Sequence, residues 1–570
     1  MRLWLGSLPP IYAMAIASLV LCLCAVCLAT FFPFPMATDT AVLFYRQDRW
    51  LLLVESGLLL AACVRTGNRE RRLDLPPWAL PLIALLLVGF CYAGGKWVLF
   101  GYELSRDEQL AVFDSKIFSS GLLAQPLPVF WQEHAAALNT LFMLPVIRPI
   151  AWVSAYLPMN AALRTVVGLV TDPSLIGPLM VALGLFSLWK CARSLWPEDR
   201  EAAVVALLLY IGSGQVLFAG MTAYAMPAHL AFNLLWLWLF LLNRRITDLA
   251  ALLVAFIATG LHQPLFHPLF AAPILFTLLR ARNWSRITLF AIGYGAICAF
   301  WLAWPGWMHG LVAGPASTMA AGTDYFTRLL ATLSQGDSNR WQEMGANLLR
   351  FFAWQHLLLL PLMVVGIAVA WHERLVGALT LSILLTAGVM LLILPYQGHG
   401  FGYRYLHGTI GVAILLAVYG WRWLAARQGW VRPLFVRATF AGLVVLLPLQ
   451  AWMGHGFYAP FAQIDRRITA SGADYFITGE NDVPCSHDLV INRPDLSNRP
   501  LRLIGEKVDE ALIRNICRSG ARVAMPTSAF FRPIEISYLM SRLTKADERF
   551  ASLSPKLSAA GCRVDRLDGP

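Results

Sequence analysis

The sequence predicts an α-helical polytopic membrane protein with a small C-terminal α/β domain, and three observations support this fold class. Of the 570 residues, 58% are hydrophobic and 14% charged, with a mean hydropathy of +0.60, which is more apolar than a soluble core needs. Apolar stretches near the length of a membrane-spanning helix recur as far as residue 453. Beyond residue 455 these stretches stop, and short strand-like and helical segments alternate.

Thirteen stretches are predicted to span a membrane as helices, in which every backbone polar group is paired within the segment. They cover residues 11–32, 50–64, 77–100, 172–192, 201–219, 225–243, 247–262, 265–280, 286–305, 347–371, 375–395, 407–424 and 434–453. The predicted domains are a membrane domain, 1–454, with outer loops at 101–171 and 306–346, and an α/β domain, 455–570.

The net charge of +12 is explained better by membrane orientation than by a nucleic-acid partner, because the basic residues gather in alternate short loops. These loops contain Arg65, Arg69, Arg71, Arg72, Lys190, Arg193, Arg200, Arg244, Arg245, Arg280, Arg282, Arg286, Arg374, Arg422, Arg427, Arg432 and Arg437. The positive-inside rule places them in the cytoplasm. We therefore expect a bacterial inner-membrane protein with a cytoplasmic N-terminus, and with loop 101–171 and the C-terminal domain outside. A cleaved signal peptide at 1–32 is the alternative, and it leaves the later loops on the same sides.

Three of the ten cysteines, Cys485, Cys517 and Cys562, lie in the polar C-terminal region. If that region is outside the cytoplasm, two of the three are able to form a disulfide bond. Their spacing does not decide which two.

The 101–171 loop is predicted to hold short interfacial helices. Leu110, Phe113 and Ile117 have helical spacing within 104–120, and prolines interrupt the chain after that. The polar 306–346 loop is expected to act as a mobile lid. In the C-terminal domain the predicted strands are 488–492, 502–504, 522–524 and 563–567, and the predicted helices are 508–516 and 535–543.

Four carboxylates stand together at the start of the first outer loop. On one helix, Glu103, Asp107 and Asp114 share a face and Glu108 is turned about 100° from Asp107. Repulsion between acids at a low-dielectric boundary raises the pKa of at least one, as a general base requires. The alternative is a solvated amphipathic face together with Arg106 and Lys116.

The order of motifs here resembles the first outer loop of the GT-C membrane glycosyltransferases. An apolar span is followed by Asp107-Glu108, a helix ending in Phe118-Ser119-Ser120-Gly121, a proline-containing turn and a His-led apolar helix, 134–144. The resemblance is greatest to the protein O-mannosyltransferase and lipid A aminoarabinose transferase branch. It implies a polyprenyl-phosphate sugar donor, inversion at the anomeric carbon, and a catalytic carboxylate at Asp107 or Glu108.

Two further motifs are similar to that family: the turn Leu261-His262-Gln263-Pro264-Leu265-Phe266-His267-Pro268 and the triplet Tyr403-Arg404-Tyr405. Three features depart from it. The acidic loop follows the third predicted span, Leu406-His407-Gly408 follows the Arg-Tyr pair, and the loop contains no Asp-x-Asp. The sequence has no nucleotide-binding glycine motif, Walker motif or zinc spacing, so no cofactor is expected. A divalent metal is possible but is not indicated, because the loop lacks Asp-x-Asp.

The candidate substrate-binding residues are Arg404, Tyr405, Lys116, His262, His267, Glu103 and Asp114. Arg404 suits a donor phosphate, because a guanidinium makes paired hydrogen bonds and keeps its charge near lipid. Lys116 is a weaker second phosphate partner. His262 and His267 have the chemistry to bind phosphate or relay protons. The alternatives are a topology anchor for Arg404, a surface charge for Lys116 and structural roles for the histidines.

The sequence thus predicts transfer of a sugar from a polyprenyl-phosphate donor to an extracytoplasmic acceptor, which is a cell-envelope glycolipid, a polysaccharide or a protein. Two alternatives stay open. An O-antigen polymerase or ligase would place its essential basic residues in a large late outer loop. A transporter or flippase for a polar lipid predicts acids inside the spans, and Glu55 is the clear example.

Overall fold

The computed structural model describes residues 10–31, 38–63, 72–76, 78–314, 339–538 and 545–569. The chain divides into two compact units. Unit 1 contains residues 1–98, 174–302 and 329–454, and unit 2 contains residues 99–173, 303–328 and 455–570. The first outer loop therefore belongs to the same compact unit as the C-terminal domain.

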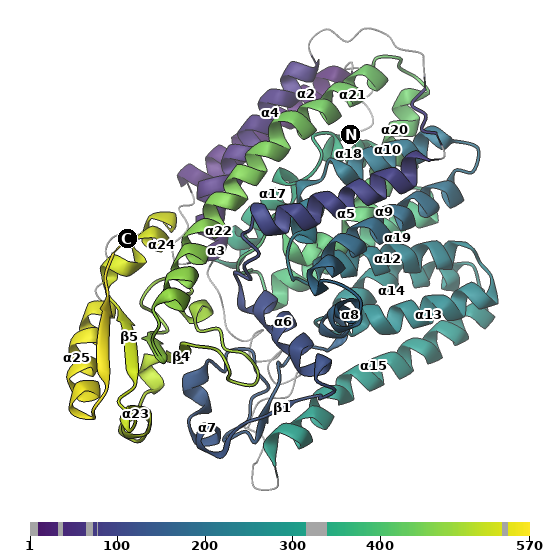
Figure 1. Cartoon of the computed structure of the whole chain (residues 1–570). Helices are drawn as coiled ribbons and strands as arrows, with labels where there is room; N and C mark the ends of the chain where they lie inside the picture. The colour runs from purple at the N-terminus through teal and green to yellow at the C-terminus, as the bar shows by residue number, and fades with distance from the viewer. Residues whose placement is uncertain are drawn as a thin grey trace. The chain divides into compact units, whose positions relative to one another are not determined.

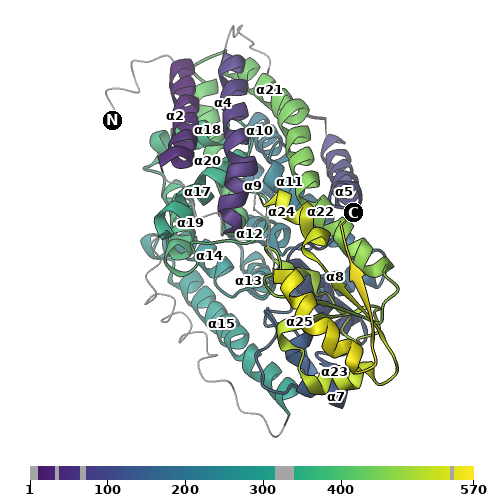
Figure 2. The same cartoon turned by 90° about the vertical axis from the view of Figure 1, so that its left-hand side faces the viewer.

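Unit 1 is a bundle of helices (Figure 1, Figure 2). Its helices, of which α15 and α22 continue into unit 2, are α2 (Pro10–Phe31), α3 (Asp39–Leu43), α4 (Arg49–Cys63), α5 (Ala79–Trp97), α9 (Ile176–Leu195), α10 (Arg200–Ile211), α11 (Gly214–Gly220), α12 (Met226–Leu241), α13 (Arg245–Thr259), α14 (Phe266–Arg280), α15 (Trp284–Ala313), α17 (Arg340–Ala353), α18 (Leu359–Ala370), α19 (Arg374–Ile393), α20 (Ile410–Ala425), α21 (Val431–Ala441) and α22 (Leu447–Ala470).

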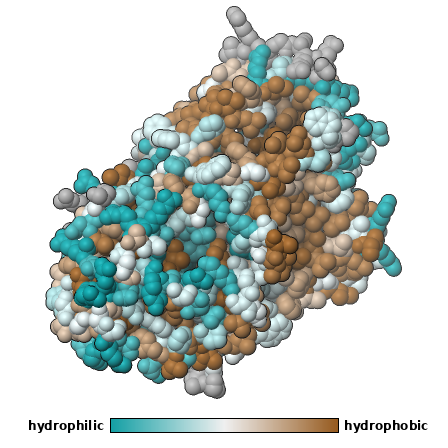
Figure 3. Space-filling view, viewed as in Figure 1, coloured by the Kyte–Doolittle hydropathy of each residue, from teal (hydrophilic) through white to brown (hydrophobic). Residues whose placement is uncertain are grey.

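The described helices confirm the predicted class of polytopic helical membrane protein. Seven are long and apolar enough to cross a membrane, or eight if the bent pair α10–α11 forms one span, and three shorter apolar helices accompany them. Large apolar side chains stay exposed on the candidate spans, such as Leu85 of α5 at 68% and Ile292 of α15 at 69%. Hydrophobic residues gather over α5 and the neighbouring helices of unit 1 in Figure 3, as a lipid-facing surface requires. The count of thirteen spans stays a prediction.

Two predicted spans are interrupted by polar hydrogen bonds. The 201–219 stretch bends by 61° between α10 and α11, where the Ser213 hydroxyl donates to Oε1 of Gln355 (2.7 Å). The 347–371 stretch breaks between Ala353 and Leu359. There the Trp354 carbonyl accepts a hydrogen bond from the backbone N–H of Gln215 (2.9 Å). The polar groups at each break are hydrogen-bonded to residues at the other break, and these bonds compensate for the helical hydrogen bonds that the breaks remove.

Helices α18 and α20 cross closely because two glycines face each other's backbone. A Cβ on Gly366 would collide with the carbonyl oxygen of Leu416, and one on Gly420 with that of Leu362. Small residues at a crossing let helices approach without a hydrophobic driving force between them.

Unit 2 contains a four-stranded parallel sheet in the order β4-β3-β5-β6. The strands are β3 (Tyr475–Thr478), β4 (Leu501–Ile504), β5 (Arg522–Pro526) and β6 (Arg563–Leu567). Helix α23 (Glu510–Cys517) connects β4 to β5, and α24 (Arg532–Ser537) and α25 (Lys545–Ala559) lie between β5 and β6. A disulfide bond joins Cys517 to Cys562. The predicted α/β domain is therefore present.

The outer-loop part of unit 2 contains α6 (Arg106–Ser119), α7 (Val129–Glu133), α8 (Met159–Gly168) and a short antiparallel pair, β1 (Gln125–Pro126) with β2 (Ala151–Trp152). One apolar core includes Leu110, Phe113 and Ile117 of α6 together with Leu503 and Val523 of the sheet. The helical spacing predicted for 104–120 is thus confirmed.

Two local predictions were wrong. Residues 488–492 form no strand. A 3-10 turn covers Ser486–Leu489, and the Asn139 side-chain amide donates to the carbonyls of His487 (2.7 Å) and Val490 (3.2 Å). The 134–144 stretch is a short 3-10 helix, Ala135–Leu138, that ends at Asn139 with φ +67°. Strand β3 and helix α25 were missed.

Of the predicted 306–346 lid, residues 306–313 are the end of α15 and 340–346 the start of α17. Residues 315–338 lie outside the described residues.

Candidate functional site

Helix α6 begins at Arg106 because Ser105 caps it. The Ser105 hydroxyl accepts from the Glu108 amide (3.5 Å), and the Ser105 amide donates to Oε2 of Glu108 (3.4 Å), forming a capping box. Glu103 therefore precedes the helix, and its predicted place on a helical face with Asp107 was wrong. The sequence Ser-Arg-Asp-Glu was itself a capping-box signal.

Asp107 and Asp114, seven residues apart on α6, both contact the segment that contains Ser154 and Tyr156. The Tyr156 hydroxyl donates to Oδ1 of Asp107, and Ser154 donates to Asp114 through its hydroxyl and through its amide (3.1 Å). Asp114 is buried, whereas Asp107 is half-buried. Burial raises the pKa of Asp114 to about 6, although the two bonds from Ser154 oppose that rise.

Glu108 is 1% exposed and is held inside unit 2. Besides its capping bond, its Oε2 accepts a hydrogen bond from the Tyr458 hydroxyl (3.3 Å). Both contacts serve the start of α6. Of the two candidate bases, Asp107 is the more accessible.

Glu103 and Lys116 lie near each other and near Arg164 of α8. Burial raises the pKa of Glu103, and the positive charges of Arg164 and Lys116 oppose that rise. Lys116, in the last turn of α6, is exposed at its surface. Arg106 instead belongs to the scaffold, because its guanidinium donates to the carbonyls of Leu141 (3.1 Å) and Asn139 (2.7 Å).

In unit 1, Arg404 begins a 3-10 turn, Arg404–Thr409, that leads into α20. Its side chain is 6% exposed, and its guanidinium carbon lies 4.7 Å from the ring centre of Tyr224 and 5.9 Å from that of Tyr405. The Tyr405 ring stacks on Phe266 at 5.8 Å. Aromatic faces thus hold a buried cation, and Tyr405 helps to position Arg404.

An acid that the sequence analysis missed, Asp39, lies close to Arg404. The two side chains both approach Gly398: a Cβ atom added to this glycine would lie 3.7 Å from a terminal nitrogen of Arg404 and 3.7 Å from Oδ2 of Asp39. Oδ1 of Asp39 is 3.5 Å from Nε2 of His399, and the Tyr396 hydroxyl donates to Oδ2 (3.2 Å). The missed signal was an acid seven residues after the first apolar stretch. One carboxylate and one imidazole do not by themselves make a metal site.

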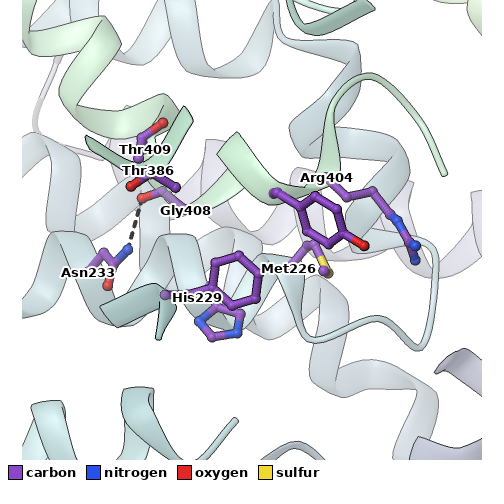
Figure 4. A pocket seen from close by; sticks show the side chains of 9 residues that line it. Met226, His229, Asn233, Thr386, Arg404, Gly408 and Thr409 are labelled. Atoms are coloured by element: carbon purple, nitrogen blue, oxygen red, sulfur yellow. Dashed lines mark hydrogen bonds between the residues drawn. The ribbon is translucent and has the colours of Figure 1, made fainter. Parts of the chain in front are cut away.

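A small cavity of about 10 Å³ lies beside Arg404 in unit 1 (Figure 4), which is roughly the space of one water molecule. Asn233, at its other end, donates to the Gly408 carbonyl (3.0 Å). His229 also lines it, is 3% exposed, and has no hydrogen-bond partner for either ring nitrogen among the described residues. His229 lies within an apolar helix, and no sequence motif distinguished it.

The two histidines of the 261–268 turn are placed differently. His267 is fully buried, with Nδ1 2.8 Å from Oδ1 of Asn233 and Nε2 2.9 Å from the Tyr294 hydroxyl. Both ring nitrogens are occupied by protein groups, which favours the structural role over substrate binding. His262 is half-buried in the turn between α13 and α14.

No protein-family model and no curated protein sequence matches this chain. Among solved structures, it is similar to ArnT from Cupriavidus metallidurans bound to undecaprenyl phosphate, with 13% identity and a TM-score of 0.48 over 73% of this chain and 84% of that chain. It is also similar to the apo state of that protein, with 12% identity and a TM-score of 0.41 over 84% and 88% of the two chains.

Proposed function

We propose that this protein is a membrane glycosyltransferase that moves a sugar from a polyprenyl-phosphate donor to an acceptor outside the cytoplasm. The observation that carries the proposal is the environment of Asp107. Its carboxylate is half-buried and accepts a hydrogen bond from the Tyr156 hydroxyl at Oδ1. It stands in the loop whose motifs resemble the GT-C enzymes. Glu108, its neighbour, is used to cap and anchor α6.

In the proposed reaction, an acceptor hydroxyl or amine attacks the anomeric carbon of the donor sugar. The new bond forms as the bond from that carbon to the phosphate oxygen breaks, and the polyprenyl phosphate leaves with the electron pair. The acceptor's proton passes to Asp107, which acts as general base. Attack opposite the leaving group inverts the anomeric centre.

Arg404 is proposed to bind the donor phosphate. A guanidinium offers two parallel donors to phosphate oxygens and stays charged when buried. The rings of Tyr224 and Tyr405 hold it in place. Donor binding and departure of the phosphate both place negative charge where this cation would stabilise it.

The proposal is tested with the purified protein in lipid nanodiscs, a polyprenyl-phosphate-linked sugar and a candidate acceptor, in parallel reactions with added Mg²⁺ or Mn²⁺ and with a chelator. Release of polyprenyl phosphate that depends on acceptor supports it. The proposal fails if a panel of such donors and envelope acceptors gives no release above that of a protein-free control.

A transporter of a polar lipid remains the second candidate, because unit 1 contains buried acids at apolar helices. Asp48 forms a fully buried ion pair with Arg350 (2.7 Å) and accepts from the Trp354 indole (2.6 Å). Glu55 of α4 is 7% exposed. Transport without sugar transfer in proteoliposomes would favour this candidate.

A further inference from the structure

A cavity of about 420 Å³ lies in unit 1 between α14 and α19, within the size range of small-ligand sites. One part of its lining is polar and basic, with Arg280, His372 and Arg374. The rest is largely apolar, with Phe276, Leu381 and Leu384. It is separate from the water-sized cavity beside Arg404, because the two have no lining residue in common.

The apolar lining is continuous with exposed hydrophobic surface. Phe276 is 51% exposed, Leu381 48% and Leu384 60%. Both α14 and α19 are apolar helices, and α19 is long enough to cross a membrane. A ligand in this cavity would therefore be in contact with lipid tails along one side.

The charges in the cavity favour an anion. Arg280 is the last residue of α14 and Arg374 the first residue of α19. The one acid in the lining, Glu373, interacts with the Tyr419 hydroxyl of α20. Two guanidinium groups next to an apolar groove match a phosphate joined to acyl chains, whereas a free phosphate would leave the apolar wall uncovered.

We propose that this groove binds one anionic glycerophospholipid, with its phosphate at Arg280 and Arg374 and an acyl chain along Phe276, Leu381 and Leu384. The site is independent of the proposed sugar transfer. It would fix the arginine-rich end of α14 and α19 at the level of the lipid headgroups.

Native mass spectrometry of the delipidated full-length protein tests the proposal, with phosphatidylglycerol and phosphatidylcholine added in equal amounts. We expect one phosphatidylglycerol to stay bound in preference. The variant Arg280→Gln/Arg374→Gln should bind it about tenfold more weakly, since two charge-assisted contacts are lost. Both side chains are exposed, so the variant should fold.

The matched control is Arg244→Gln/Arg245→Gln, which removes two exposed arginines where another apolar helix, α13, begins. It should keep the wild-type occupancy. If the two double variants lost the same amount of bound phosphatidylglycerol, exposed arginines would attract anionic lipid wherever they lie. The proposal of a specific site would then fail. It would also fail if undecaprenyl phosphate displaced phosphatidylglycerol at equal concentration, because the groove would then be a carrier site.

Discussion

The Tyr156 hydroxyl donates a hydrogen bond to Oδ1 of Asp107. Ser154, two residues before Tyr156, donates two hydrogen bonds to Asp114. Two acids on one face of α6 are therefore placed in different environments. Asp114 is buried and accepts two hydrogen bonds from Ser154, whereas Asp107 is half-buried. Different environments give two carboxyl groups different chemistry, and this contrast leads to the predictions for Asp107 and Asp114.

Asp107→Asn is expected to abolish sugar transfer while donor binding and folding are retained. The amide keeps the volume of the side chain and still accepts from Tyr156, but it has no basic oxygen. Loss of a general base typically costs about 10²- to 10⁴-fold in rate. The measurement is kcat in nanodiscs, with donor binding followed separately.

Glu108→Gln is the matched control for that variant. Glutamine at this position still completes a capping box, so we expect near wild-type transfer. If Glu108→Gln were the more damaging change, the base would be Glu108. Wild-type rates in both variants would remove the main chemical support for a glycosyltransferase.

Arg404→Gln is expected to reduce transfer far more than Lys116→Gln. Losing a paired contact to a phosphate in a desolvated site costs about 2–5 kcal/mol, whereas Lys116 lies at the exposed surface of α6. Donor affinity and kcat/KM are the quantities to compare. Arg404→Lys keeps the charge but loses the planar fork, so it should recover activity in part. Equal activity of the two Gln variants would make Arg404 an anchor.

Asp114→Asn is expected to become increasingly more stable than the wild type as the pH rises from 4 to 7. Burial raises the pKa of Asp114 from 3.8 to about 6 in the folded protein. Its favourable contribution is therefore complete below pH 3.8 and lost as the pH rises through 6. The full change is on the order of 3 kcal/mol. Thermal unfolding in detergent across this range tests it, and a pH-independent difference would show that Asp114 does not titrate there.

Residues 120 and 497 are expected to lie on the same, non-cytoplasmic side. We would introduce Ser120→Cys, Ser497→Cys or Ser285→Cys into a variant whose unpaired cysteines are serine, and label intact cells with an impermeant thiol reagent. All three serines are exposed. Ser285 lies among the arginines that are expected in the cytoplasm, so the Ser285→Cys variant should react only after the cells are lysed. Labelling of just one of Ser120→Cys and Ser497→Cys would contradict the proposed orientation.

The fold class and the position of α6 were readable from the sequence, because both depend on local periodicity. A lipid-facing helix must be apolar along its length, and Leu110, Phe113 and Ile117 repeat with the period of a helix packed on one side. The C-terminal region was recognisable as α/β for the same reason. Its missed strand, β3, does not alternate between polar and apolar residues, because three of its four positions are buried.

The tertiary structure alone decided what each polar side chain contacts. Where a strand was predicted, a 3-10 turn forms, and Asn139 binds the carbonyls of His487 and Val490, hundreds of positions away in the chain. Both ring nitrogens of His267 are occupied by Asn233 and Tyr294, and Asp39 lies near Arg404 although the two are 365 positions apart in the chain. Hydrogen bonds and ion pairs depend on distances in space, and one sequence does not contain the distances between segments far apart along the chain. The sequence therefore determined the membrane class and the main helices, and packing determined which acids, arginines and histidines remain available for chemistry.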